Sequence, residues 1–291
     1  MIGLLGGERP AGRPARLLFV HAHPDDETLT TGVAIAHHVA AGDDVHVLTC
    51  TLGEEGEVIP RDLAHLEGAG AALAAHRRGE LDRAMALLGV SHHVLGSGTA
   101  GAAEAFRDSG MAGSASAEHP RAFASVPLHE AAGAVRAVLE QVDPDVVVSY
   151  DASGGYGHPD HVRTHEATRE AVASVGSGAP TLLAALTPLS WATEDRRWLA
   201  EHVPDGQGWV IPGEGNPYAA SVVPDPVVTR AVVDAEAEKV RTRALREHET
   251  QVVVGEGWYA LSNRYVFRLA GREGYARLDP ATGRPVPEGA A

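Results

Sequence analysis

Short apolar runs alternate with longer amphipathic runs along most of the chain. The short runs are rich in Val, Leu and Ile, as is typical of buried strands, and the longer Ala-rich runs have helical periodicity. This alternation is the pattern of βαβ units, so we predict an α/β fold with a Rossmann-like, mostly parallel sheet flanked by helices. We expect strands at residues 16–20, 45–51, 92–95, 146–150 and 181–186. We expect helices at 28–41, 69–88, 128–141 and 227–249, and a further helix that follows residue 161 and ends at about residue 175.

The other segments have weaker patterns. Residues 96–127 show little periodicity and predict a long loop over the sheet. The Trp-, Pro- and Gly-rich stretch up to about residue 226 predicts irregular structure, and residues 251–267 alternate as an edge hairpin does. We therefore expect a catalytic core at 14–176, a C-terminal part at 177–270 that completes the same domain, and frayed tails at 1–13 and 271–291.

Two of the predicted strands end in clusters of histidine and acidic residues. The first strand leads into His21-Ala22-His23-Pro24-Asp25-Asp26-Glu27, and the strand at 146–150 is followed by Tyr156-Gly157-His158-Pro159-Asp160-His161. The carboxyl ends of strands in an open α/β sheet line one crevice, whatever the sequence distance between them. The two clusters are therefore expected to form one site.

The residue types of these clusters suit hydrolysis at a metal. Imidazole and carboxylate bind zinc, and a catalytic zinc site uses three protein ligands and a water. We propose His23, Asp26 and His161 as the ligands, with Asp25 beside them to take a proton from the water. His158 would carry positive charge near the developing oxyanion or protonate a leaving amine.

Other interpretations of the same residues remain open. Each cluster alone is a common polar turn, in which Pro fixes φ and Asp caps a helix, but the recurrence of the cluster at two strand ends argues against that interpretation. Two histidines and a carboxylate also bind non-haem iron(II), although those sites usually lie in β-barrels, so Fe²⁺ is an alternative occupant. No Gly-x-Gly-x-x-Gly follows the first strand, and the acids there would repel a pyrophosphate, which argues against a dinucleotide-binding enzyme.

The amino-acid composition limits the binding partners and the cellular compartment that we expect. A net charge of −15 without any Lys/Arg-rich run excludes nucleic acid as an expected partner and disfavours strongly anionic substrates. Cys50 is the single cysteine, so an internal disulfide is excluded and a reducing cytoplasm is the expected location. We find neither an apolar stretch of bilayer length nor the apolar core of a signal peptide, and expect no membrane partner. The sequence does not indicate an oligomeric state.

The two strand-end motifs also resemble those of a known family. Residues 22–27 and 155–161 are similar to the signature motifs of the LmbE-like (PIG-L) zinc deacetylases. The stretches 45–58, 107–113 and 250–254 are similar to the members of this family that remove acetate from N-acetylglucosaminyl-inositol in mycothiol biosynthesis. Two segments depart from the family pattern: residues 99–106 look lengthened and residues 178–189 look shortened, and both changes could reshape the substrate crevice.

The resemblance implies a zinc-dependent amide hydrolase acting on a small amino sugar. Alternatives are a mycothiol S-conjugate amidase, a deacetylase of another N-acetylglucosamine conjugate, and a metal-stabilised sugar-binding protein without turnover. The last would have no need of Asp25 and His158. The resemblance implies zinc ligation by His23, Asp26 and His161, catalytic roles for Asp25, Tyr156, His158 and Asp160, and substrate binding by Arg77, Asp108 and Gln251.

Overall fold

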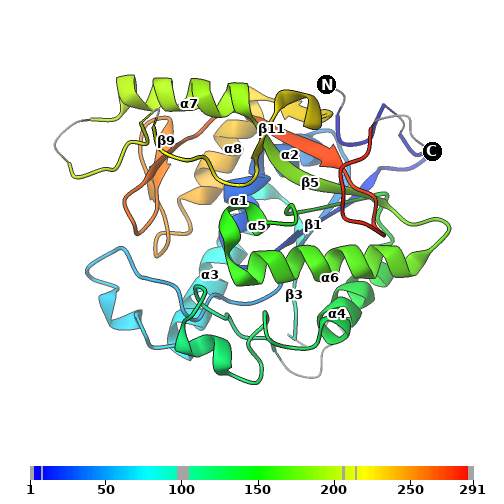
Figure 1. Ribbon diagram of the computed structural model, residues 1–291, viewed down its shortest axis with the longest axis horizontal. Helices are drawn as coiled ribbons and strands as arrows, with labels where there is room; N and C mark the ends of the chain where they lie inside the picture. Colours follow the sequence, from blue (N-terminus) through cyan, green and yellow to red (C-terminus); the bar gives the residue numbers. More distant parts are fainter. Residues whose placement is uncertain (1–2, 8, 97–104, 205–206, 214, 288–291) are drawn as a thin grey trace.

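The computed structural model describes residues 3–7, 9–96, 105–204, 207–213 and 215–287. Among these residues an eight-stranded mixed sheet forms the centre of the molecule (Figure 1). Its strands lie in the order β3-β2-β1-β4-β5-β11-β7, and β6 pairs with β5 outside this path. The strand bounds are β1 Arg16–His21, β2 Asp44–Thr49, β3 Ser91–Val94, β4 Val146–Ser149, β5 Thr181–Pro188, β6 Val222–Val223, β7 Arg230–Val233 and β11 Arg272–Arg277.

Strands β1 and β4 lie side by side although most of the N-terminal half separates them in sequence. They pair in parallel, with Leu17 opposite Val146 and Phe19 opposite Val148. From β1 the chain crosses to β2 on one side, whereas β4 lies on the other side. This is the point where the strand order reverses, and open α/β sheets bind ligands there, outside the carboxyl ends of the strands. The predicted Rossmann-like arrangement of the two strand ends is confirmed.

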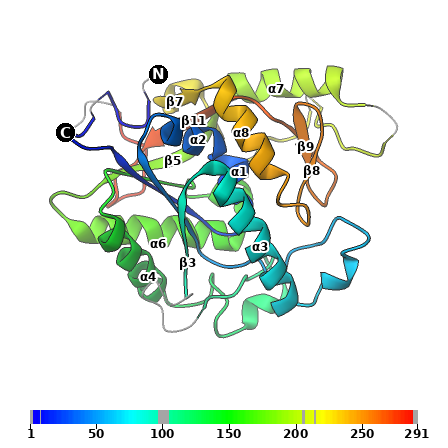
Figure 2. The same ribbon diagram turned by 180° about the vertical axis from the view of Figure 1, so that it is seen from behind.

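Helices cover both faces of the sheet. Figure 1 shows α4 and α6 in front of it, and Figure 2 shows α2, α3 and α8 on the opposite face. The helix bounds are α1 Asp26–Thr30, α2 Gly32–Ala40, α3 Ala71–Leu88, α4 Leu128–Val142, α5 Gly154–Gly157, α6 Pro159–Val175, α7 Leu189–His202 and α8 Ala235–Leu245, with short 3₁₀ turns at Ala64–Leu66, Ala115–Glu118 and Asp225–Val227.

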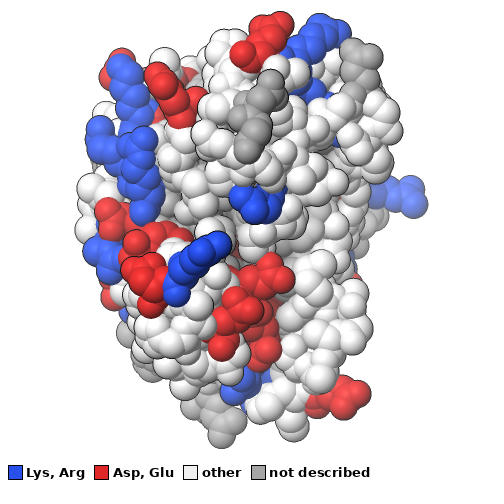
Figure 3. Space-filling view, turned by 90° about the vertical axis from the view of Figure 1, so that its left-hand side faces the viewer, with Lys and Arg blue, Asp and Glu red and all other residues white. Residues whose placement is uncertain are grey.

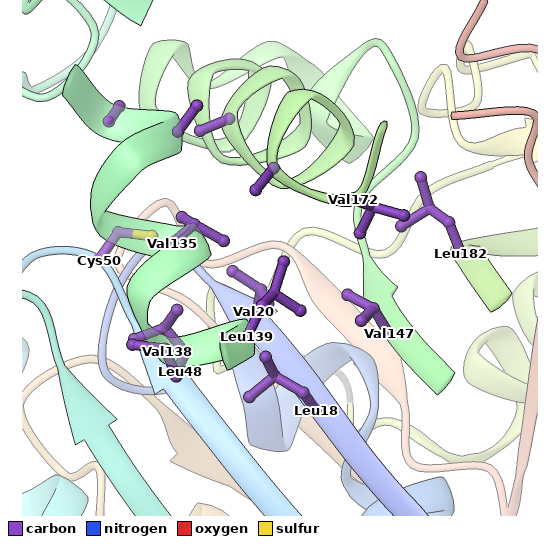
Figure 4. Close-up of a cluster of buried hydrophobic side chains, with 14 of the residues drawn as sticks. Leu18, Val20, Leu48, Cys50, Val135, Val138, Leu139, Val147, Val172 and Leu182 are labelled. Atoms are coloured by element: carbon purple, nitrogen blue, oxygen red, sulfur yellow. The ribbon is translucent and has the colours of Figure 1, made fainter. Parts of the chain in front are cut away.

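Alternate residues of β1 pack into two separate hydrophobic cores. Leu18 and Val20 point toward α4 and α6, where they contact a cluster that includes Val135 and Val172 (Figure 4). Leu17 and Phe19 point toward the opposite face, where α2, α3 and α8 pack. Successive side chains of a strand face opposite ways, and each fully buried aliphatic side chain contributes roughly 1.5–3 kcal/mol. The polar residues that follow β1 are thus held by a strand anchored on both faces.

A smaller antiparallel sheet lies beyond the main one. It contains β8 (Val253–Val254), β9 (Trp258–Ala260) and β10 (Val266–Arg268), in the order β10-β9-β8. The alternation at 251–267 predicted an edge hairpin. The antiparallel strands are confirmed, but they form a separate three-stranded sheet and not a hairpin at the edge of the main sheet. Residues 97–104, which contain most of the segment that looks lengthened, lie outside the described residues. No helix in the described part of the chain is long and apolar enough to cross a bilayer.

The predicted helix at 227–249 is wrong in its first part. Residues 230–233 form strand β7, which pairs with β11, and the helix starts only at Ala235. The side chain of Asp234 caps this helix by accepting hydrogen bonds from the backbone N–H of Glu236 (2.9 Å) and Ala237 (3.0 Å). Helix α7 in the stretch predicted to be irregular was also missed, because the Pro and Trp residues around it obscured its periodicity.

The prediction of frayed tails is wrong for parts of both termini. Strand β11 lies between β5 and β7 and is antiparallel to both, and its Tyr275 is fully buried. Its sequence, Arg-Glu-Gly-Tyr-Ala-Arg, lacks an aliphatic run, so the periodicity of the chain does not reveal it. Near the other terminus, Leu4 is fully buried and its carbonyl accepts a hydrogen bond from Arg230 Nη1.

Candidate active site

The two polar clusters meet where β1 and β4 end. His23 follows β1, and Asp26 is the first residue of α1. His158 precedes α6 as its N-cap, with Pro159 as the first helical residue, where proline costs no hydrogen bond. His161 thereby falls in the first turn of α6. The local sequence thus places both clusters on helix starts directly beyond the sheet.

Asp26 lies within contact distance of both other proposed metal ligands. Asp26 Oδ2 is 3.3 Å from His23 Nδ1 and 3.2 Å from His161 Nε2. The same carboxylate oxygen accepts the backbone N–H of His23 at 2.9 Å, which fixes its orientation. All three side chains are nearly buried. The structure therefore brings together His23, Asp26 and His161.

The donor atoms at this point suit a cation. His161 Nε2 is buried and has no hydrogen-bond partner among the described residues, although Asp26 Oδ2 is near. Two donor atoms on one tetrahedral zinc, with bonds of about 2.0–2.1 Å, are separated by roughly 3.3 Å. The two distances from Asp26 Oδ2 match this separation, and His161 Nε2 is left free for a ligand bond.

Carboxylates surround His23 and give the site a negative electrostatic potential. Its Nε2 lies 3.3 Å from Asp160 Oδ2 and 3.5 Å from Asp108 Oδ1. Burial alone would lower the pKa of His23, but these carboxylates and Asp26 outweigh it and raise that pKa well above its usual value. Such surroundings favour a positive charge. Two groups of potential metal ligands occur here within the described chain, His23 with His158 and His161, and His23 with Asp108 and Asp160.

Asp25 is placed beside this cluster with an unusual environment. Its carboxylate is nearly buried and lies 3.5 Å from Arg77 Nη2. Burial raises the pKa of Asp25 to about 7, against the opposing effect of Arg77. A carboxylate whose pKa is near the operating pH is suited to accept a proton in the transition state.

His158 and Asp160 are linked to each other. The backbone N–H of Asp160 donates to His158 Nδ1 at 3.2 Å, which leaves the ring proton on Nε2. Burial lowers the pKa of His158 to about 4, so the free site holds this imidazole neutral. Asp160 is fully buried and its Oδ2 accepts the backbone N–H of Ser109 at 2.9 Å. Asp160 is thereby fixed between His23 and the segment after Arg107.

Tyr156 differs from the other site residues in being exposed. It lies in α5, with Gly155 and Gly157 on either side, both with positive φ (74° and 96°). Its side chain is 60% exposed, and its ring centroid is 5.0 Å from that of His161. The side chain of Tyr156 lies at the edge of the site. Because the glycines on either side of it allow the backbone to turn, this side chain can approach a bound ligand.

The three residues implied in substrate binding occupy different environments. Arg77 is buried and donates hydrogen bonds to the carbonyls of Pro24 (2.7 Å) and Gly53 (2.9 Å). Gln251 is half-buried, and its Nε2 donates to the carbonyl of Glu57 at 2.9 Å. Both therefore hold the loop after β2, whereas Asp108 lies beside His23. A Cβ at Gly56 would lie 2.8 Å from Arg77 Nη1, so this loop passes closely over the guanidinium.

Sequence reasoning missed Tyr150 as part of the site. Its hydroxyl accepts the backbone N–H of Ala22 at 3.0 Å, and its ring stacks on His161 with centroids 4.4 Å apart. It thus ties the loop after β1 to the first turn of α6. The available signal was an aromatic polar residue at the end of an otherwise aliphatic strand.

Comparison with known proteins shows which family the chain represents. A family model described as PIG-L, GlcNAc-PI de-N-acetylase, matches residues 18–172. The chain belongs to this family. Proteins named 1D-myo-inositol 2-acetamido-2-deoxy-alpha-D-glucopyranoside deacetylase are similar to this chain over nearly its full length. One from Rhodococcus jostii is 43% identical, covering 94% of this chain and 95% of its own. One from Mycolicibacterium smegmatis is 43% identical, covering 92% of this chain and 91% of its own.

Solved structures share the fold at low sequence identity. N,N'-diacetylchitobiose deacetylase from Pyrococcus horikoshii matches with a TM-score of 0.51 and 21% identity, covering 84% of this chain and 74% of its own. A teicoplanin deacetylase matches with a TM-score of 0.52 and 20% identity, covering 91% of this chain and 99% of its own. The hydratase GalB from Pseudomonas putida matches with a TM-score of 0.53 and 18% identity, covering 95% of this chain and 100% of its own. Because a hydratase shares this PIG-L-like fold, the fold alone does not specify the reaction.

Proposed function

We propose that the protein is a metal-dependent deacetylase that hydrolyses the acetamide of N-acetylglucosaminyl-inositol, giving glucosaminyl-inositol and acetate. The observation that carries this proposal is the contact of the Asp26 carboxylate with both His23 and His161, with the Asp25 carboxylate on the adjoining residue. The names of relatives that are 41–45% identical support the substrate.

Zinc is the proposed metal, and Fe²⁺ is the alternative. His23, Asp26 and His161 would hold it, since the orphaned Nε2 of His161 and the surrounding carboxylates suit a divalent cation. Such a metal, when bound, polarises a carbonyl oxygen and lowers the pKa of water.

The side chains around the metal site then have separate roles as proton acceptor and as hydrogen-bond donors. Asp25 takes the proton of the attacking water, and its pKa of about 7 suits this role near neutral pH. His158 carries its ring proton on Nε2 and donates a hydrogen bond to the oxyanion of the tetrahedral intermediate. Tyr156 adds a second donor from the exposed side of the site. Asp25 then gives this proton to the amine nitrogen as the C–N bond breaks, and the second proton of the water passes from the acetic acid to the amine, which leaves acetate and an ammonium group.

Asp160 has a supporting role in this proposal. Its carboxylate faces His23, and its backbone N–H fixes the tautomer of His158. A ligand histidine and the oxyanion donor are thus oriented by one buried residue.

The surface charge agrees with a neutral sugar that becomes a cation on reaction. The chain has a net charge of −15. Figure 3 shows a face on which Asp and Glu side chains gather across the middle, whereas Lys and Arg side chains gather mainly to one side above them. Such a surface repels polyanions and tolerates an amine product. Arg77, Asp108 and Gln251 remain the proposed substrate-binding residues. The buried Arg77 would act by holding the loop after β2, and Gln251 would act at the same loop.

One experiment tests the reaction and its rivals together. The purified protein is assayed for metal content and for acetate release from N-acetylglucosaminyl-inositol, free N-acetylglucosamine and, by amine release, a mycothiol S-conjugate. We expect one metal per chain and the highest kcat/KM for N-acetylglucosaminyl-inositol. Preference for the S-conjugate would indicate the amidase, and a metal-loaded protein that binds the sugar without releasing acetate would indicate a binding protein.

A further inference from the structure

Asp25 has a backbone conformation that residues with a side chain seldom adopt. Its φ is 123° and its ψ is −35°. Asp143 and Arg264 are the other non-glycine residues with positive φ in the described chain, but their values of 48° and 66° lie near the ordinary left-handed region. The conformation of Asp25 is strained, so its neighbours must hold it in place.

Hydrogen bonds on both sides of Asp25 maintain this conformation. Its carbonyl accepts the N–H groups of Thr28 (3.0 Å) and Leu29 (2.8 Å), as expected at the start of a helix. Its own N–H donates to Oε2 of Glu27 at 3.1 Å. The second bond depends on a side chain, and therefore on whatever orients Glu27.

His248 is the distant residue that orients Glu27. Both side chains are fully buried, and His248 Nε2 lies 3.1 Å from Glu27 Oε1. The same oxygen accepts the hydroxyl of the adjacent Thr28 at 2.5 Å. His248 follows α8, and its carbonyl accepts the N–H groups of Gln251 and Val252, both at 3.0 Å. One residue thus connects the backbone of Asp25 with the turn that carries Gln251.

We propose that His248 is a positioning residue that, through Glu27, holds Asp25 in its strained conformation and so directs the Asp25 carboxylate toward the reacting water. This inference rests on the proposed role of Asp25 as general base. Without the Nε2–H donor of His248, only the hydroxyl of the adjacent Thr28 holds Glu27 Oε1, so Glu27 shifts and Asp25 relaxes to an ordinary φ. The carboxylate then points away, while His23, Asp26 and His161 keep their places.

Two substitutions separate positioning from simple packing. His248→Leu fills the volume without a donor, whereas His248→Gln places an amide N–H near the position of Nε2. We expect His248→Leu to lose about 100-fold in kcat, because small misplacements of a reacting group cost this much. KM should stay within roughly twofold, with metal content unchanged. His248→Gln should recover most of kcat. Wild-type kcat in His248→Leu, or equal loss in both variants, would overturn the proposal.

A second readout does not depend on turnover. Hydrogen–deuterium exchange of the peptide covering residues 23–29, measured on metal-free protein, reports the Asp25 amide together with the amides of Thr28 and Leu29 that bond to the Asp25 carbonyl. We expect faster exchange in His248→Leu and near-native exchange in His248→Gln, and equal exchange in all three proteins contradicts the proposal. If the wild-type protein releases no acetate, the proposed function fails, and this comparison still decides the role of His248.

A matched control addresses general loss of stability. Glu273 is another buried carboxylate, and it accepts the N–H groups of Val33 and Ala34, both at 2.8 Å, away from Asp25. Glu273→Gln should lower thermal stability while leaving kcat and the exchange of residues 23–29 unchanged. If His248→Leu does not fold, His248→Met tests the same link, since its flexible side chain fills a similar volume and donates no hydrogen bond to Glu27. A wild-type kcat for His248→Met would then refute the proposal.

Discussion

His161 Nε2 lies 3.2 Å from Asp26 Oδ2 without a hydrogen bond between them. The two atoms come from the first turns of α6 and α1, which follow β4 and β1. A buried nitrogen next to a carboxylate, left without a hydrogen-bond partner in the described chain, is the arrangement that a cation bound by both atoms would produce. The contact therefore carries a direct prediction about metal content.

Replacing His161 with Gln should remove the metal, whereas replacing His165 with Gln should not. Both histidines are buried on α6, one helical turn apart, but the ring of His165 is bound to the carbonyl of Tyr150 at 2.9 Å. We expect less than about a tenth of an equivalent of metal in His161→Gln after gel filtration, since loss of one of three ligands weakens binding severely. Elemental analysis measures this. Equal metal content in the two variants would exclude His161 as a ligand.

Asp25→Asn should retain the metal and lose catalysis. The amide keeps the size of the side chain but cannot accept the proton of water, so kcat should fall by about 10²–10⁴-fold. Asp143→Asn is the control, because Asp143 also has positive φ but pairs with Arg16 far from the site. It should leave kcat within roughly twofold. The proposed base is excluded if Asp25→Asn retains full acetate release.

Tyr156→Phe tests the second oxyanion donor. The substitution removes only the hydroxyl of a side chain that is 60% exposed, so stability and metal content should be unchanged. We expect a loss of about 10–100-fold in kcat with little change in KM, slightly below the usual cost of an oxyanion donor because His158 remains. Steady-state kinetics on N-acetylglucosaminyl-inositol measure both constants. A rise in KM alone would assign the hydroxyl to substrate binding instead.

The site could be predicted from the sequence because its residues follow two recognisable buried strands. Leu17 to Val20 and Val146 to Val148 are continuous apolar runs, and the polar residues after them could be placed by the rule for parallel sheets. The register between the strands then brought His161 to Asp26 without further assumptions.

The parts that were not predicted depend on non-local contacts. Strand β11 contains Gly274, whose missing side chain allows close approach to the carbonyl of Leu186, and no local pattern marks such a strand. The boundary between β7 and α8 depends on the cap formed by Asp234. Likewise the roles of Tyr150 and His248 arise only where distant segments meet, so their residue types alone do not reveal them.

Stability should fall as the pH decreases below neutrality, in part because of His165. Burial lowers the pKa of this side chain in the folded state below its usual value near 6.5. As the pH falls through the unfolded pKa, the unfolded chain binds a proton that the folded chain does not, so unfolding becomes easier. His165→Gln should therefore show a smaller loss of unfolding free energy between pH 7.5 and 5.5 than the wild type, measured by urea denaturation. The other histidines are the same in both proteins, and an equal or larger loss in the variant would contradict the assignment.

Cys50 should be inert in the folded protein despite lying close to the site. Its side chain is fully buried, and burial raises the pKa of the thiol to about 12. The thiolate is the reactive form, so at pH 8 alkylation by iodoacetamide should be more than roughly a thousandfold slower than that of a free thiol. In guanidinium chloride the same cysteine should react completely, which mass spectrometry can follow. Fast modification of the native protein would show that the strand ends open to solvent, and acetate release from the modified protein would then report whether that opening reaches the metal site.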